Sequence, residues 1–144
     1  MADMFPTIPT GAPPQAGDKI GRVPAFDSET NRFLLLDGAL VERTGREAVQ
    51  QWFDLMLRQR IDRVPIYRMS GETKLGVDRD MLGSRLPSGL ITAEIERNVR
   101  ETASFCPAVR AVRDFSVTQR GRSCHVEFTA ELYTDETLEV QMDV

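Results

Sequence analysis

The final third of the chain alternates apolar and polar residues with a period of two, and this pattern constrains the fold more than any other feature. It extends through residues 112–119, 123–133 and 137–144, and residues 120–122 and 134–136 are expected to form the turns between these segments. Successive side chains of a strand point to opposite faces. The pattern therefore predicts an antiparallel three-stranded meander with one face on a core and one in water. The side chains expected on the core face are Phe115, Val117, Cys124, Val126, Phe128, Ala130, Leu132, Leu138, Val140, Met142 and Val144.

Two segments have the 3.6-residue period of amphipathic helices. In the first, Thr44 and Glu47 are spaced as a capping box, and the helix is expected to end near Ile61. Trp52 is expected at the centre of its apolar face. The rest of that face is Ala48, Val49, Phe53, Leu55, Met56 and Leu57, and the expected solvent face is Gln50, Gln51, Asp54, Arg58 and Gln59.

The second helix is expected over about residues 90–105 and ends before Pro107. Its apolar face holds Ile91, Ile95, Val99, Ala103 and Cys106. Short strands are expected at 32–36 and around 39–43, because an Asp-Gly turn signal separates two apolar runs there. Residues 80–86 are expected to add a helical turn.

Residues 1–25 are rich in proline, with five of the eight prolines of the chain. Such a stretch can form neither a helix nor a central strand. Two interpretations stay open, a disordered tail and an arm that orders on a neighbouring subunit. The expected organisation is an extended proline-rich arm at 1–25 and one α+β domain at 26–144. In that domain two helices pack on one face of a mainly antiparallel sheet that ends in the meander.

Composition narrows the function classes. A length of 144 residues suits one domain. A net charge of −4 argues against nucleic-acid binding. No apolar run approaches the roughly 18 residues that cross a bilayer, and the first residues do not resemble a secretory signal, so a cytoplasmic product and no membrane partner are expected. Cys106 and Cys124 have no metal-site spacing and are expected to be buried thiols.

Catalytic chemistry finds little support in the sequence. His125 is the only histidine, and Ser123 and Glu127 lie two residues to either side. Alternate residues of a strand project in parallel about 6.5–7 Å apart, so these three side chains are not expected to hydrogen-bond in series as a triad. A surface histidine is the preferred interpretation. We predict no catalytic residue, cofactor or metal ligand, and no enzyme activity.

Protein–protein interaction is the remaining class. The final strand is a candidate sheet edge, and exposed edges accept strands from partners. Its acidic residues would favour a basic partner. The alternative is a plain edge strand whose charges only prevent chance pairing.

The runs 37–76 and 91–132 resemble the baseplate wedge family of contractile phage tails, the W-like or "tail lysozyme-like" proteins, and especially their relatives in PBSX-type prophages. The resemblance covers about residues 30–140. It rests on the order of short motifs: Asp37-Gly38, Ala48–Gln51, Tyr67–Gly71 and Pro107–Val109. The family's Glu-Pro-Arg is Cys106-Pro107-Ala108 here, and Arg110 is the nearest substitute for the missing arginine.

The resemblance implies a structural wedge subunit, present in six copies around the tail axis, that joins the wedge to the first sheath ring and starts sheath assembly by strand pairing. It implies location in the virion tail baseplate, and in the host cytoplasm during assembly. The implied partners are other wedge proteins and tail sheath subunits, with hub or tube proteins as further candidates. The candidate partner-binding residues are Phe5, Ile8, Pro107, Val109, Arg110, Leu138, Val140 and Met142.

Two other hypotheses stay open. One is a small cytoplasmic regulatory adaptor that binds a single partner and forms no ring. The other is an enzyme with an unusual site, whose activity would depend on His125. The neighbouring genes would distinguish the first of these from the wedge subunit.

Overall fold

A computed structural model describes residues 20–61 and 75–144 of this chain. Its main sheet is the expected meander, formed by β7 (Val109–Arg120), β8 (Ser123–Leu132) and β9 (Thr137–Asp143) in the order β7-β8-β9, with both pairs antiparallel. The even-numbered residues of β8 and β9 are buried and the odd-numbered ones are at least partly exposed. The alternation in the sequence is therefore the two-faced pattern of this sheet.

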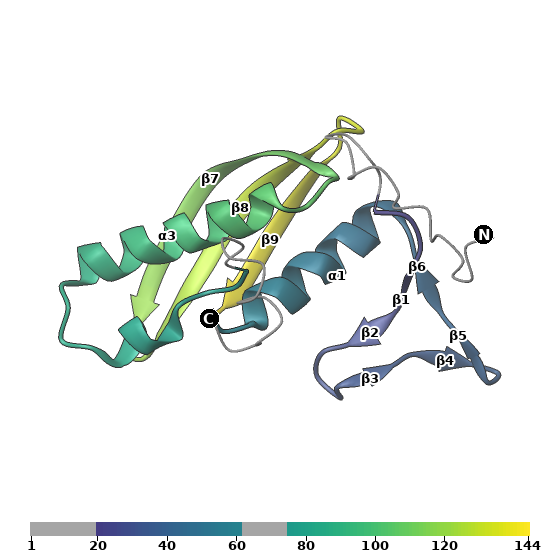
Figure 1. Ribbon diagram of the computed structural model, residues 1–144, viewed down its shortest axis with the longest axis horizontal. Coiled ribbons are helices and arrows are strands. Elements are labelled where there is room, and N and C mark those ends of the chain that lie inside the picture. Colours follow the sequence, from purple (N-terminus) through teal and green to yellow (C-terminus); the bar gives the residue numbers. More distant parts are fainter. Residues whose placement is uncertain (1–19, 62–74) are drawn as a thin grey trace, which may run out of the picture.

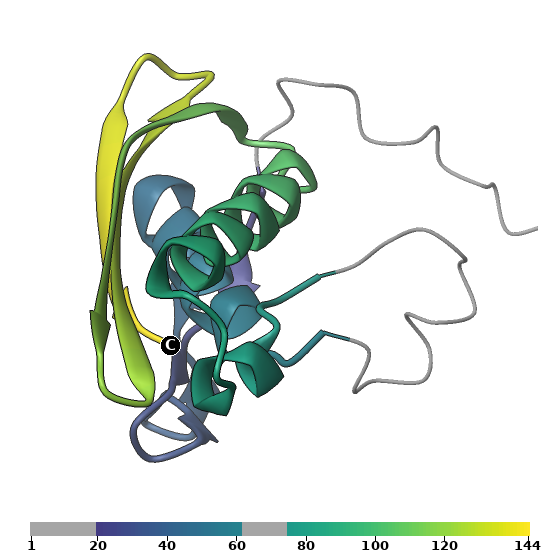
Figure 2. The same cartoon turned by 90° about the vertical axis from the view of Figure 1, so that its left-hand side faces the viewer.

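Two helices cover the apolar face, which confirms the predicted α+β class. They are α1 (Gly45–Arg58) and α3 (Ser88–Ser104), and both lie on the same side of the sheet when it is seen edge-on (Figure 2). α3 lies against β7, and α1 contacts β9 (Figure 1). The expected face of α3 is confirmed, since its four apolar residues and Cys106 are all buried.

The centre of α1 differs from the prediction. Phe53, not Trp52, is fully buried, and its ring meets that of Phe128 on the central strand edge-on, at 5.2 Å between centroids. The buried stripe follows Val49, Phe53 and Leu57, so Trp52 is turned to the flank of the core and is only partly buried. The helix ends at Arg58, three residues before the predicted end. The capping box is also not formed. Thr44 is the N-cap residue, but its side chain makes no capping hydrogen bond.

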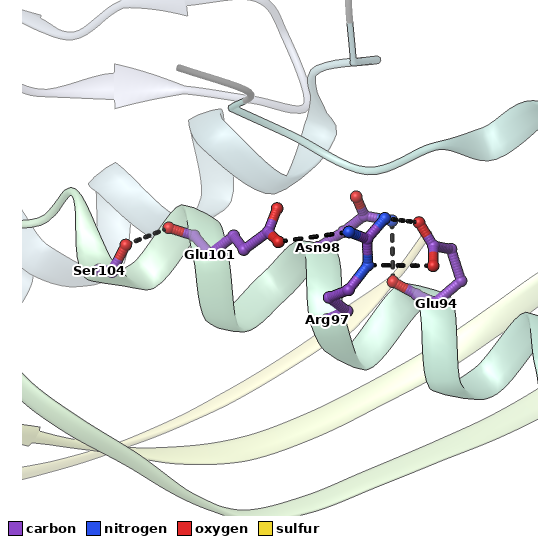
Figure 3. Close-up of polar contacts among 5 residues, drawn as sticks. All are labelled: Glu94, Arg97, Asn98, Glu101 and Ser104. Carbon is purple, nitrogen blue, oxygen red and sulfur yellow. Dashed lines mark hydrogen bonds and ion pairs between the residues drawn. The ribbon is translucent and has the colours of Figure 1, made fainter. Parts of the chain in front are cut away.

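Polar contacts within the helix connect several side chains of α3 (Figure 3). Arg97 pairs with Glu94 and with Glu101. The buried amide of Asn98 donates to the backbone carbonyl of Glu94 at 2.8 Å, and Ser104 donates to that of Glu101 at 2.6 Å. The two ion pairs, three and four residues apart, stabilise the helix locally.

Residues 23–43 form a separate unit at one end of the molecule, called here the β triangle (Figure 1). It contains three antiparallel ladders of two residue pairs each. Their strands are β1 (Val23–Pro24) with β6 (Glu42–Arg43), β2 (Phe26–Asp27) with β3 (Arg32–Phe33), and β4 (Leu35–Leu36) with β5 (Ala39–Leu40). The predicted turn between 32–36 and 39–43 is confirmed, with positive φ at Asp37 and Gly38.

A closed ring of hydrogen bonds joins the three ladders. The amide of Ala25 donates to the carbonyl of Val41 (2.7 Å), that of Leu34 to Ala25 (2.8 Å), and that of Val41 to Leu34 (3.0 Å). Ala25 is fully buried at this junction. The expected boundary between arm and domain at 25/26 is therefore wrong, because residues 23–25 belong to the fold. Of the rest of the arm, Ile20 packs against the core, and residues 1–19 lie outside the described residues.

Gln51 of α1 attaches the β triangle to the helical layer. Its amide nitrogen donates to the carbonyl of Pro24 (2.8 Å), and its amide oxygen accepts from the backbone of Phe26 (2.9 Å) and from Arg43 (3.0 Å). Gln51 was expected on the solvent face, but it is 6% exposed. A buried side-chain amide needs such partners, and the β triangle supplies them from three strands, β1, β2 and β6.

The connection between the helices closes against α3. A 3₁₀ helix, η1 (Arg79–Gly83), occupies part of the segment where a helical turn was expected. Before it, Gly76 adopts φ +108°, and a Cβ there would lie 2.4 Å from the carbonyl oxygen of Gln59. The amide of Gly76 donates to the buried hydroxyl of Thr102 at 3.1 Å. This position thus requires glycine because of its backbone conformation and its close neighbour.

Candidate strand-pairing edge

Among the residues that the structure describes, the outer side of β9 is an open sheet edge. Cys124 and Val144 exchange both of their backbone hydrogen bonds, with N···O distances of 3.0 and 2.9 Å. Bonded and non-bonded pairs alternate along an antiparallel ladder. The even-numbered residues of β9 therefore bond to β8, and the odd-numbered ones turn their N–H and C=O groups away from it. The outward residues are Thr137, Glu139, Gln141 and Asp143.

The register of this edge is regular. Pairing with β8 continues from Thr137 to Asp143 without a shift. Within the described residues no other strand pairs with β9. A regular row of unpaired backbone groups of this kind is a template for a strand from another chain.

The opposite edge, β7, has a different construction. Its register with β8 shifts twice, between Val109 and Ala111 and between Arg113 and Ser116, and Asp114 in the second shift has φ +55°. Such bulges bend and twist a strand. Arg100 of α3 also covers this edge, because its guanidinium donates to the carbonyl of Val112 at 3.2 Å and lies 4.9 Å from the Phe115 ring centroid.

A groove lies between β9 and the exposed flank of α1. It is lined by Arg43, Arg46, Glu47, Gln50, Leu138 and Glu139. A strand added to β9 would turn one set of side chains towards this mixed-charge groove. The other set would lie beside Glu139, Gln141 and Asp143, so the outer face of an added strand would meet two carboxylates.

His125 fastens β9 to β8 at the end of this edge. Its Nδ1 lies 2.6 Å from Asp143 on β9, and its Nε2 lies 3.0 Å from Glu127 on its own strand. Hydrogen bonding to Asp143 first, and to Glu127 second, raises the pKa of His125 above its ordinary value. Glu127 reaches His125 because the flexible glutamate side chain spans the distance between alternate residues of the strand. Ser123 does not complete a series, since its hydroxyl donates to the carbonyl of Arg120 at 3.0 Å.

Both cysteines are buried thiols, as expected, and burial raises the pKa of each. In the part of the chain that the structure describes, no group of three or more His, Cys, Asp or Glu side chains is placed to hold a metal ion. In the same residues, no helix is long and apolar enough to span a membrane.

The candidate partner-binding residues of β9 have a different role from the one expected. Leu138, Val140 and Met142 have side chains in the core and backbone groups directed at β8. The backbone groups that could bond to an added strand therefore belong to the residues between these three. Sequence analysis named Leu138, Val140 and Met142 as partner-binding residues, but on β9 these buried residues are also the ones whose backbone groups bond to β8. On this strand the outward backbone groups therefore belong to the exposed residues.

The other candidates are spread over the molecule. Pro107 is half-buried and Val109 is buried after the end of α3, whereas Arg110 is exposed and pairs with Glu131 and Asp135. Phe5 and Ile8 lie outside the described residues. Residues 107–110 thus lie at the β7 side of the sheet and are not brought together with the β9 edge.

Sequence reasoning missed the role of Gln51 and the apolar surface of the β triangle. The run Phe33 to Leu36 was a usable signal, since four successive large apolar residues cannot all turn inward from a two-stranded ribbon.

Comparison with known families and with curated proteins provides no assignment, since no family model and no curated protein matches this chain.

Proposed function

We propose that this protein is a non-catalytic structural subunit that accepts a strand from a neighbouring protein along β9. The observation that carries the proposal is the uninterrupted register of β9, with four residues that direct backbone groups outward. Main-chain hydrogen bonds supply affinity in such complexes, and the flanking side chains supply specificity. Glu139 and Asp143 favour a partner strand with basic residues on its outer face.

We further propose that the assembly is the baseplate of a contractile phage tail or a related injection particle, in which the chain links the wedge to the first sheath ring. The order of motifs over residues 30–140 supports this assignment. The strand that pairs with β9 then comes from a sheath subunit, and six copies around the tail axis multiply weak pairings by avidity.

The test uses a matched pair of proline variants, because proline removes a backbone donor and blocks pairing on the side where that donor points. Gln141 directs its amide outward from β9. Gln119 does the same on β7, since its opposite residue Cys124 gives both of its bonds to Val144. Tagged protein is recovered from cells that assemble the particle, and the proteins that co-purify are quantified by mass spectrometry.

Gln141→Pro is expected to lower the amount of recovered sheath subunit at least about tenfold and to keep the wedge proteins, whereas Gln119→Pro behaves as the wild type. Sheath recovery that is unchanged by Gln141→Pro would sink the strand-pairing proposal. A single partner sensitive to Gln141→Pro, recovered without sheath or wedge proteins, would favour the adaptor instead. Deletion of 137–144 is a poorer test, because it removes four buried side chains from the core.

A further inference from the structure

The β triangle exposes a concentrated set of large apolar side chains. Leu36 is 69% exposed, Leu35 63%, Phe33 56%, Leu40 54% and Leu34 38%. Leu35 is paired with Leu40 and Leu36 with Ala39, so apolar side chains lie on both faces of the β4–β5 ribbon. Over both faces together, these five side chains leave on the order of 500 Å² of apolar surface, and exposed apolar surface of this extent marks contact sites.

Two residues of opposite charge flank this apolar segment. Arg32 precedes Phe33, and Asp37 follows Leu36. Both are exposed, and neither makes an ion pair or side-chain hydrogen bond with another described residue. The nearby pair Arg22 and Glu42, in contrast, is joined at 3.5 Å.

The segment 32–37 is complementary to itself when its direction is reversed. An antiparallel copy places Arg32 opposite Asp37 at both ends, and Phe33, Leu34, Leu35 and Leu36 face one another between them. We propose that two copies of this chain dock through residues 32–37 about a two-fold axis near Leu34 and Leu35. Such an interface is isologous, so each copy contributes the same surface.

The expected size of the contact limits its strength. Burial of all of this surface on both copies would give about 1,000 Å² in total, and a contact through one face of the ribbon buries less, which is below the size of most specific interfaces. The dimer is therefore weak and depends on concentration. This interface does not involve β9 and goes beyond the proposed function, so either can fail without the other.

The experiment measures the dimer Kd of the full chain by sedimentation equilibrium over a wide range of concentrations. Arg32→Glu leaves two acidic ends on each copy, and Asp37→Lys leaves two basic ends. Each variant alone is expected to raise the Kd at least about tenfold, because like charges then face each other. An equimolar mixture of the two variants restores both pairs, and its Kd is expected to return to within about threefold of the wild type.

The mixture makes the test independent of small losses of stability, since the same two proteins are compared alone and together. Leu35→Ser should abolish the dimer, and Leu90→Ser, at a 51% exposed leucine on α3, should leave it unchanged. A wild type that stays monomeric at all concentrations, or a mixture no stronger than its components, would overturn the proposal.

Discussion

The two edges of the main sheet differ although each is a single strand beside β8. β7 has two register shifts, a residue with positive φ and an arginine on an outward carbonyl. β9 is regular and has none of these features within the described residues. Natural sheets protect their edges by bulges and charged side chains. Bulges and a covering arginine therefore protect β7, whereas within the described residues β9 has only its carboxylates, Glu139 and Asp143, beside a regular row of outward backbone groups.

The largest expected effect on stability comes from placing proline at an inward-bonding residue of β9 and comparing it with proline at an outward-bonding one. Val140→Pro removes a donor directed at β8 and a fully buried side chain, and is expected to lower the free energy of unfolding by about 3 kcal/mol or more. Gln141→Pro removes an outward donor and should cost within about 1 kcal/mol. Urea denaturation compares the two. Equal losses of unfolding free energy would contradict the assignment of Val140 as inward-bonding and Gln141 as outward-bonding.

A smaller effect tests the protection of β7. Arg100→Ala removes the cation–π contact with Phe115 and the hydrogen bond to Val112, and is expected to cost about 1 kcal/mol. Hydrogen exchange should become faster for β7 amides and stay unchanged for β9. Faster exchange in β9 alone would show that Arg100 does not protect the β7 edge.

The smallest of the three effects is a pH dependence at the end of β9. The pKa of His125 is raised in the folded state by Asp143 and Glu127. The stabilising contribution of the protonated ring is therefore complete below its unfolded pKa, near 6.5, and is lost as pH rises through the raised value. Urea denaturation should show this loss in the wild type but not in His125→Gln. The same pH dependence in both proteins would assign it to another group.

Most of the fold could be predicted because its signals are local. The alternation of residues 123–144 and the helical stripe of α3 determine which side chains are buried, and both predictions are confirmed. The centre of α1 could not be predicted from its sequence, because Trp52 and Phe53 both satisfy a helical period. The choice between them depends on the position of Phe128, in a strand that is distant in sequence.

The candidate site was predicted only in part. An acidic last strand indicated an edge, but the residues available for pairing follow from which hydrogen bonds β8 already uses. The function of Gln51 was not predictable, since its partner Pro24 lies in the segment that was interpreted as an arm and its partner Phe26 lies directly after it. The protection of β7 by Arg100 likewise depends on the packing of α3 beside that strand.

The ring of hydrogen bonds among Ala25, Leu34 and Val41 has a consequence for how this end of the molecule opens. Each ladder of the β triangle contains only two residue pairs, so none is stable by itself. Because the ring joins all three, loss of one ladder releases the other two. We therefore expect the β triangle to open as one cooperative unit while the sheet and helices stay folded. Its exposed leucines are then ordered only while the whole unit is folded, so a partner bound to them stabilises the folded state of all three ladders.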